Sequence, residues 1–434
     1  MAAGDSPNNK SGQTDGGEAP PAAAAACSAV PAAEWERLGW DLTELILCRL
    51  PLRSLVRAGA VCRQWRAVVA RCPPSTWSSS RRRLPWLFVF AHHNLVPRLS
   101  SAFAYDPSDD ESAWIPLPAP SAPLPDSFSG SGGFSFSFLS SSPSRLSLSP
   151  LLRPQTTFLS PPLAFPRSNP LVVSVLSSGH ERPSVVVVGG ARVVGGLVDI
   201  EDRLPVEIYE AGDDAWELGP PLPAEFRPGC SSQWLSAALL PGRGLLFVLA
   251  TYSGVLSAFD LARGAWTRPR PLRPRAPGPP PLFAFLAAAR GRLVLAGLRS
   301  GPDYGPAQFA VWAVDDAAME CEEVGAMPAE LLAWLFDGEG AAAAAADDDD
   351  DRFASLKCAG VDGVVYVFNE DRHRGFPACV CEISEDDDAP GGLRCAWRKV
   401  PPLPAPVDPF HKVIAFCSPV PVHPVLAPRG PVVR

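Results

Sequence analysis

The hydrophobic residues of the chain follow two different periods, and the change between them divides the sequence. Between residues 36 and 78 the apolar positions recur every three or four residues, which predicts short amphipathic helices. Pro51 divides this stretch, because proline fixes its own φ and keeps the preceding residue out of helical geometry. We therefore predict a small all-α module over residues 36–78. Such a module buries too little apolar surface to be strongly stable alone, so we expect it to dock on another surface.

From Leu84 onward the period shortens to two, and the chain repeats one unit. Each unit has an apolar strand that often ends in glycine, a second strand that ends in an acidic turn, and a tryptophan followed by Leu-Pro. The separation from Trp216 to Trp266 is 50 residues, as is that from Tyr209 to Phe259. Repeats near 50 residues with several strands each are typical of β-propeller blades, which bury both faces of every sheet by radial stacking.

Six copies of the unit predict a mainly β fold with a six-bladed propeller over residues 84–420. The weakest copy, Arg145–Ser149 with Thr157–Leu159, lacks the tryptophan. The segment Lys412–Cys417 is a candidate extra strand that would close the ring against the first blade. We expect the recurrent aromatic residue to pack between neighbouring blades.

The chain ends and two inserts have compositions that do not predict packed structure. Residues 1–33 are mostly small and polar without periodicity and cannot offset the entropy of ordering, so we predict a disordered tail. Residues 421–434 are a second predicted tail. The proline-rich insert Pro269–Pro281 and the insert Ala341–Asp351, which runs from alanine into aspartate, are predicted loops. The proline run could instead be an extended ligand for a groove-binding domain.

Composition and charge narrow the classes of partner. The chain of 434 residues has 38 Lys+Arg against 46 Asp+Glu, which excludes a broadly basic nucleic-acid binder.

Eleven cysteines without a C-x-x-C pair, and no secretory segment, predict reduced thiols in the cytoplasm, the nucleus or both. No apolar run reaches about 20 residues, so we expect no membrane partner. Residues 36–83 include ten arginines and only three acidic residues, so this segment is locally basic. Within it, Arg81–Arg83 is a weak alternative signal for nuclear import or nucleic-acid binding.

The sequence shows no pattern of catalytic or metal-ligating residues. No close His-x-His or His-x-x-x-His pair, phosphate-binding glycine loop, serine nucleophile elbow or metal-spaced Cys/His set occurs. The histidines are His92, His93, His180, His373, His411 and His423. We therefore expect a non-catalytic protein with no metal and no cofactor.

The helical stretch resembles an F-box. The family pattern begins Leu-Pro-Asp-Asp-Leu, continues with Ile-Leu and Leu-Pro, and ends Val-Cys-x-x-Trp. It stands here as Leu38-Gly-Trp-Asp-Leu42, Ile46-Leu47, Leu50-Pro51, Val61-Cys62 and Trp65, with matching offsets. Gly39 replaces the usual proline, and Trp40 stands where an acidic residue is common.

The strand repeats resemble degenerate kelch blades, with the double glycine preserved at Gly189-Gly190. Taken together, residues 36–420 resemble a plant F-box/kelch-repeat protein. The resemblance implies a substrate receptor of a Skp–cullin–F-box (SCF) ubiquitin ligase, which binds a Skp-type adaptor, and through it cullin, and holds a protein for ubiquitination and proteasomal degradation. Some plant relatives recruit phenylpropanoid or flavonoid enzymes, so the resemblance implies such an enzyme as the target.

The resemblance also implies ten residues that form or support the adaptor-binding surface, about half of which would only hold the small helices together. They are Leu38, Leu42, Ile46, Leu47, Leu50, Pro51, Leu55, Val61, Cys62 and Trp65. An arginine-rich flank would suit an acidic adaptor by electrostatic steering. It consists of Arg49, Arg53, Arg57, Arg63 and Arg66.

The alternative function is a propeller scaffold or transcriptional co-regulator that binds a partner protein outside a ligase, and Gly39 is the feature that favours it. Kelch propellers usually bind partners through loops at the mouth of the ring. The candidates are Asp303-Tyr304, Glu370–His373 and Trp234, but each is better explained as a solvated loop residue or a packing aromatic. The sequence therefore assigns no substrate-binding residue.

Overall fold

The computed structural model describes most of the chain between Gly39 and Val420. The residues described are 39–420 without 48, 51–53, 55–57, 59–60, 72–83, 109–113, 121–122, 140–141, 153–156, 176–182, 196, 211, 276–280, 302–306, 338–352, 354, 371–375 and 387–391. The predictions for the two tails, for the insert at 341–351 and for Arg81–Arg83 therefore lie outside the described residues.

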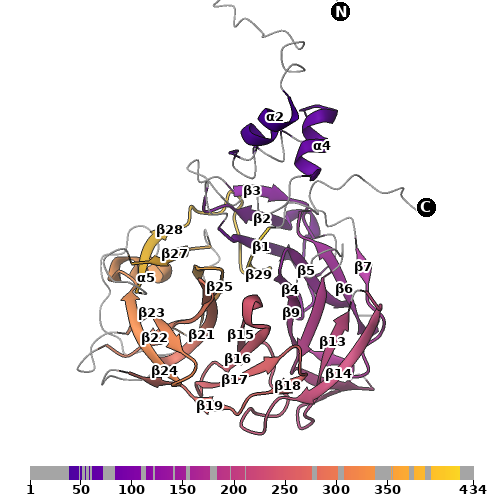
Figure 1. Ribbon diagram of the computed structural model, residues 1–434, viewed down its shortest axis with the longest axis vertical. Coiled ribbons are helices and arrows are strands. Elements are labelled where there is room, and N and C mark those ends of the chain that lie inside the picture. Colours follow the sequence, from indigo (N-terminus) through magenta and orange to yellow (C-terminus); the bar gives the residue numbers. More distant parts are fainter. Residues whose placement is uncertain are drawn as a thin grey trace, which may run out of the picture.

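Two helices precede the strands and lie at the rim of the sheets (Figure 1). They are α2 (Trp40–Leu47) and α4 (Arg63–Arg71), and they contact each other. The carbonyl of Gly39 accepts the N–H of Thr43 at 3.0 Å and the Thr43 hydroxyl at 3.1 Å, so α2 begins immediately after the glycine. We call this pair of helices, with the described residues between them, the helical module.

The described strands form six sheets of four or five strands and one sheet of three. The first sheet contains β29 (His411–Ser418), β1 (Trp86–His93), β2 (Ser101–Tyr105) and β3 (Trp114–Leu117). The second contains β4 (Ser129–Ser131), β5 (Phe134–Leu139), β6 (Ser142–Pro150) and β7 (Phe158–Leu159). The third contains β9 (Leu171–Val175), β10 (Ser184–Val188), β13 (Pro205–Glu210) and β14 (Ala215–Pro221).

The remaining elements complete the chain. The fourth sheet contains β15 (Leu235–Leu240), β16 (Leu245–Ala250), β17 (Val255–Asp260), β18 (Ala265–Trp266) and β19 (Arg270–Pro271). The fifth contains β20 (Arg273–Pro274), β21 (Pro281–Ala289), β22 (Arg292–Arg299), β23 (Gln308–Asp315) and β24 (Glu320–Ala326). The sixth contains β25 (Leu356–Val361), β26 (Val364–Asn369), β27 (Ala378–Glu385) and β28 (Leu393–Lys399). The three-stranded sheet contains β8 (Arg167–Ser168), β11 (Ala191–Val194) and β12 (Leu197–Asp199), and there are a helix α5 (Ala329–Asp337) and two short 3₁₀ helices, η2 (Pro97–Leu99) and η3 (Pro241–Arg243).

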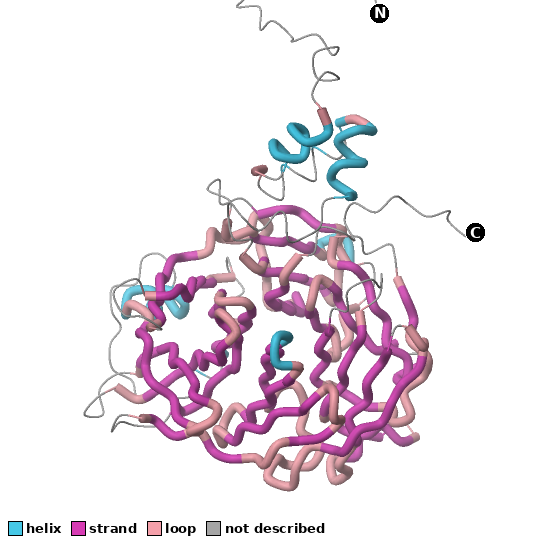
Figure 2. Tube along the Cα trace, in the orientation of Figure 1, coloured by secondary structure: helices cyan, strands magenta, loops and turns pink. Residues whose placement is uncertain are grey.

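The larger sheets are arranged radially around a common centre (Figures 1 and 2). Their innermost strands β29, β4, β9, β15, β21 and β25 contact one another in that order, and β25 contacts β29. The described hydrophobic core is divided accordingly. Five of its six clusters each join two adjacent sheets. The sixth cluster joins the helical module to the first sheet and to residues that flank the strands of the second. The fold is mostly β and propeller-like, and radial stacking buries both faces of the sheets.

The last strand closes the arrangement against the first. β29 pairs antiparallel with β1 along their whole length, from Trp86 opposite Ser418 to His93 opposite His411. This pairing confirms the prediction that the segment at 412–417 adds a strand to the first sheet. The weakest sequence copy also forms paired strands, since β6 and β7 pair through Leu148 opposite Phe158.

In three sheets, the first, third and fourth, the recurrent tryptophan connects the sheet to the one before it. The indole N–H of Trp114 donates to Pro401 O at 2.9 Å, that of Trp216 to Pro161 O at 2.8 Å, and that of Trp266 to Pro220 O at 3.1 Å. In each pair the carbonyl comes from the preceding sheet or the segment that leaves it. The expected packing of an aromatic residue between neighbouring sheets is therefore confirmed at these three positions.

The proline-rich insert is not only a loop, which corrects the prediction for Pro269–Pro281. β19 pairs with β17 of the fourth sheet, and β20 pairs with β24 of the fifth in the parallel sense. Both strands have two residues and lie at sheet edges, where proline costs little because no neighbour requires its missing N–H. The insert thus spans two adjacent sheets.

Candidate binding surfaces

Helix α2 carries an apolar face that the protein leaves exposed. Leu42, Ile46 and Val61, three of the residues predicted for adaptor binding, are 54%, 41% and 67% exposed. Leu42 and Ile46 are four residues apart, so they lie on one side of the helix. An exposed apolar patch of this kind on a small module is typical of a protein–protein interface.

Other predicted residues support the module instead. Leu47 is fully buried, and Leu50 and Trp65 are half-buried against the cluster that joins the module to the first two sheets. Cys62 is exposed, and its Sγ accepts the N–H of Trp65 at 3.3 Å. The structure thus separates the list into exposed and supporting residues. Leu38, Pro51 and Leu55 lie outside the described residues.

Two exposed residues of α2 were missing from the predicted set. Trp40 is 47% and Leu45 52% exposed. Leu45 lies on the side of the helix that carries Leu42 and Ile46, whereas Trp40 is three residues before the buried Thr43 and seven before the buried Leu47, and so lies on their side. Leu45 belongs to the helical period of the sequence, so its position carried a signal. Nothing in the sequence marked Trp40 as a binding residue, because the family pattern has an acidic residue at that position.

A second group of exposed apolar side chains lies on one face of the ring. The strands of each larger sheet are counted here from the innermost one outward, and neighbouring strands run antiparallel. The turn between the second and third strands therefore lies on the same face of the ring as the connection that arrives from the preceding sheet. The chain enters β1 from the helical module at the opposite end of that strand, so we call this face the distal face. The exposed apolar residues in its connections are Leu95, Leu99, Val194, Leu197, Val198, Ile200, Trp234, Tyr252, Leu282 and Phe410.

Aromatic residues gather on part of the distal face. The ring centroids of Trp234 and Tyr252 are 5.3 Å apart, and those of Tyr252 and Phe283 are 6.2 Å apart. Trp234 was a candidate from the sequence, and it is half exposed on this face. Asp303-Tyr304 and most of the candidate Glu370–His373 lie outside the described residues, and Glu370 faces Lys357 at 3.9 Å.

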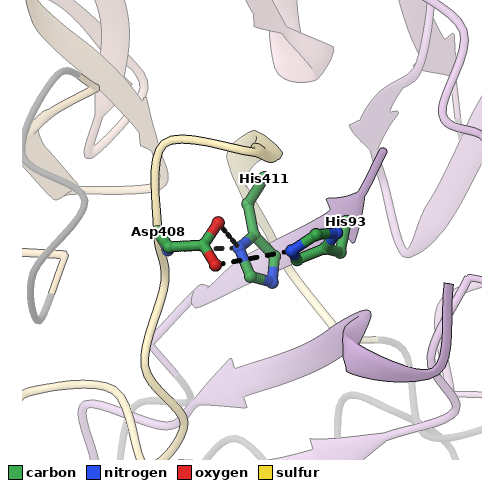
Figure 3. Close-up of side chains that lie close together, drawn as sticks. All are labelled: His93, Asp408 and His411. Atoms are coloured by element: carbon green, nitrogen blue, oxygen red, sulfur yellow. Dashed lines mark hydrogen bonds and ion pairs between the residues drawn. The ribbon is translucent and has the colours of Figure 1, made fainter. Parts of the chain in front are cut away.

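Two histidines and an aspartate meet where the first and last strands pair on the distal face (Figure 3). His411 Nδ1 lies 2.8 Å from Asp408 Oδ1, and His93 Nε2 lies 3.4 Å from Asp408 Oδ2. Burial raises the pKa of Asp408, but the hydrogen bonds from His411 and from the Phe410 N–H outweigh it and hold the pKa below its usual range. The carboxylate thus ties the segment before β29 to the end of β1.

These three residues have the ligand types of a metal site, and their ligand atoms lie within 4.8 Å of one another. However, Nδ1 of His93 accepts the N–H of Leu95 at 3.2 Å and that of Val96 at 2.9 Å. A neutral imidazole with an accepting Nδ1 carries its proton on Nε2, the atom that faces Asp408. The arrangement therefore fits a hydrogen-bonded clasp better than a metal centre, and the sequence missed it because residues 93 and 411 are far apart along the chain.

Comparisons of the chain with known proteins show the family to which it belongs. The F-box domain matches residues 35–76. An F-box/kelch-repeat protein of Arabidopsis thaliana is 30% identical over 394 residues, which cover 87% of this chain and 89% of that protein. The chain belongs to the F-box/kelch-repeat family. The F-box and this relative support a substrate-receptor role in an SCF ubiquitin ligase.

Other relatives match less of the chain. F-box only protein 6 of Arabidopsis thaliana is 26% identical over 300 residues, which cover 68% of this chain and 59% of that protein. Among solved structures, the WD40 repeats of RRP9 align over 74% of this chain and 82% of that one, with 10% identity and a TM-score of 0.36. In the part of the F-box/kelch chain that the structure describes, no helix combines the length and apolar character that a membrane span requires.

Proposed function

We propose that this F-box/kelch protein is the substrate-recognition subunit of an SCF ubiquitin ligase. The helical module binds the Skp-type adaptor, which connects it to cullin, and the distal face holds the substrate protein. The observation that carries the proposal is the exposed apolar face of α2, formed by Leu42, Leu45 and Ile46, inside a segment that matches the F-box domain. Burying such a face on assembly is the main favourable term in protein association.

The mechanism requires no bond chemistry from this chain. A receptor that binds the adaptor at one end and the substrate at the other keeps a substrate lysine near the ubiquitin-carrying enzyme. The transfer then becomes effectively intramolecular, and the local concentration of the lysine rises accordingly. The separation of the α2 face from the distal face supports this division of labour, because one partner does not block the other.

We also propose finer assignments. The six larger sheets act as six kelch blades, which their innermost strands support by contacting one another in a cycle. A phenylpropanoid or flavonoid enzyme is the target suggested by the resemblance to plant relatives, and the cytoplasm or the nucleus is the compartment suggested by the free thiols.

Adaptor capture tests the receptor role. We expect the double substitution Leu42→Asp with Ile46→Asp to weaken capture of a purified Skp-type adaptor at least 100-fold, because it places two charges in an apolar contact. The same change at an exposed apolar residue of the outermost strand, Leu218→Asp, is the control and leaves capture unchanged. Leu50 and Trp65 are poorer targets because they pack against the first two sheets. Unchanged capture by the double variant would favour the alternative, a scaffold that acts outside a ligase.

Substrate capture tests the finer assignment. Proteins retained by the full chain with the proteasome blocked are compared with those retained by a variant that lacks residues 35–76. We expect the same set from both, since the distal face is intact in each, and we expect ubiquitinated forms only with the full chain. A set without phenylpropanoid or flavonoid enzymes would refute the proposed target class.

A further inference from the structure

The third sheet carries an insertion between its second and third strands that the other sheets lack in the described residues. The chain leaves β10 at Val188, forms β11 and β12, and returns to β13 at Pro205. β11 pairs with β12 and, on its other side, with β8, which precedes the third sheet. By the connection it occupies, this small sheet projects from the distal face.

The root of the insertion is held by a buried ion pair. The side chains of Arg167 in β8 and Glu207 in β13 are fully buried, and their Nη2–Oε1 distance is 2.5 Å. Arg167 also donates to Gly189 O at 3.0 Å and to Pro205 O at 3.1 Å, at the two ends of the insertion. Glu207 accepts the N–H of Ala164 at 2.9 Å, so both charges are compensated.

Glycines bring the insertion close to the neighbouring chain. Gly190 has φ of +84° and donates its N–H to Cys230 O at 2.7 Å, and a Cβ at that position would lie 2.8 Å from Ser168 O. Gly229 has φ of +62°, and a Cβ there would lie 2.5 Å from Ile200 O. Only glycine fits these approaches, so the base of the insertion is rigid.

The end of the insertion is different, because it exposes apolar side chains on a strand with a free edge. Leu197 is 78% exposed, and Val194, Val198 and Ile200 are each more than half exposed. Among the residues that the structure describes, β12 pairs with β11 only. Its outer backbone N–H and C=O groups therefore face no other strand, and such an edge is a template for another chain.

The charges beside this edge are acidic. Arg192 is paired with Asp202 at 2.6 Å, and Arg203 donates to Pro223 O at 2.8 Å and to Ala224 O at 2.9 Å. Asp199 and Glu201 have no ion pair with another described residue. A complementary partner has positive charge at the positions beside Asp199 and Glu201.

We propose that the free edge of β12 is the docking site for an extended segment of the substrate in which apolar residues alternate with lysine or arginine. The segment adds a strand beside β12. On one face its apolar side chains contact Val198 and Ile200, and on the other its basic side chain lies beside Asp199. This assignment rests on the receptor role proposed above. The rigid base lowers the entropy cost of binding, because the edge is already in strand conformation.

The test uses the full chain in complex with a Skp-type adaptor and a labelled nine-residue peptide in which valine alternates with lysine. We expect saturable binding by fluorescence anisotropy. The charge reversal Asp199→Lys with Glu201→Lys weakens it at least tenfold and gives measurable binding of the matching valine–glutamate peptide. The matched control, Asp213→Lys with Glu217→Lys, makes the same charge change in β14, the outer strand of the third sheet, and in the turn before it. It leaves the first peptide's affinity unchanged.

Three outcomes would overturn the proposal. One is the absence of binding up to millimolar peptide, and another is equal weakening by the two charge reversals. The third is a dimer of the complex that Leu197→Asp dissociates, which would mean that a second copy covers the edge. Adaptor capture measured on the same preparations tests the receptor role separately. If the protein binds the peptide but does not capture the adaptor, only the receptor role is refuted. If it captures the adaptor but does not bind the peptide, only the docking site is refuted.

Discussion

The helical module and the propeller-like body, by which we mean the strands and α5, differ in how far they bury their apolar residues. All six residues of β26 are buried, including five apolar side chains between the first, fifth and sixth sheets. Helix α2 is similarly apolar, yet only Thr43 and Leu47 are buried, and its four other large apolar residues are each more than 40% exposed. A sheet of the ring has a neighbour on each face, whereas α2 packs on one side only. The exposed apolar residues of α2 therefore contribute little to the packing of the described residues, and this supports the adaptor-binding surface proposed above.

The largest expected effect comes from the interior of the body. Arg167→Met removes the partner of Glu207 and leaves a buried carboxylate without a cation, so we expect a loss of about 3–5 kcal/mol of unfolding free energy. The second substitution Glu207→Leu should restore much of it, because no uncompensated charge remains. Urea denaturation measures both variants. An unchanged midpoint for Arg167→Met would contradict this account of the body, whereas adaptor capture by the folded variant should stay at the wild-type level.

A smaller effect is expected between two sheets. Arg243 in η3 donates to both carboxylate oxygens of Asp316, at 3.0 and 2.8 Å, and this hydrogen bonding lowers the pKa of Asp316 although partial burial opposes it. Because the folded pKa is lower than the unfolded value of about 3.9, the stabilisation is fully present above that value and is lost as the pH falls through the folded pKa. Both side chains are partly exposed, so we expect at most about 1 kcal/mol.

The variant Asp316→Asn isolates this contribution. Thermal unfolding followed from pH 6 to pH 2 should fall less steeply with acid for the variant than for the wild type, and the two should converge at the lowest pH. Identical slopes would show that the pair contributes nothing to the acid response of the body.

The smallest effect concerns the start of α2. Gly39 is exposed, a Cβ there would meet nothing within 4 Å, and its carbonyl accepts the first helical N–H, so it occupies the N-cap position. Serine caps a helix better than glycine by a few tenths of a kcal/mol, and it restricts the unfolded chain. We expect Gly39→Ser to raise adaptor affinity by about twofold. The control Gly242→Ser, at another open site in η3, should change nothing. Weaker adaptor binding by Gly39→Ser would contradict the capping argument.

Much of the fold followed from local patterns. The repeating unit of two strands and a tryptophan, and the closing strand β29, were predicted from the sequence, because short apolar runs with a period of two indicate strands. The innermost strands β9 and β15 were not part of that unit. The hairpin of β11 and β12 was missed, although Gly195-Gly196 between two apolar pairs is a recognised hairpin signal. Helix α5 was also missed, and its leucines are buried between the fifth and sixth sheets.

The candidate sites divide in the same way. Leu42, Ile46 and Val61, which were predicted for adaptor binding, are exposed, but the sequence did not distinguish them from Leu47, which is buried. Their binding of an adaptor stays a prediction. The clasp of His93, Asp408 and His411 had no local signal beyond the Asp-x-x-His spacing, because its two histidines come from the first and last strands of the body.

By itself, the sequence determined the periods: helical over the first module, alternating afterwards, with an aromatic residue at a regular interval. These periods depend only on residues close together in the sequence, because the geometry of a helix or strand fixes which of its side chains point to the same side. The tertiary structure decided which strands meet. It paired β1 with β29 and buried Arg167 against Glu207. Among the residues that the structure describes, it left the outer edge of β12 unpaired and one side of α2 exposed. Such contacts join residues tens to hundreds of positions apart, and only the packed sheets bring them within reach of one another.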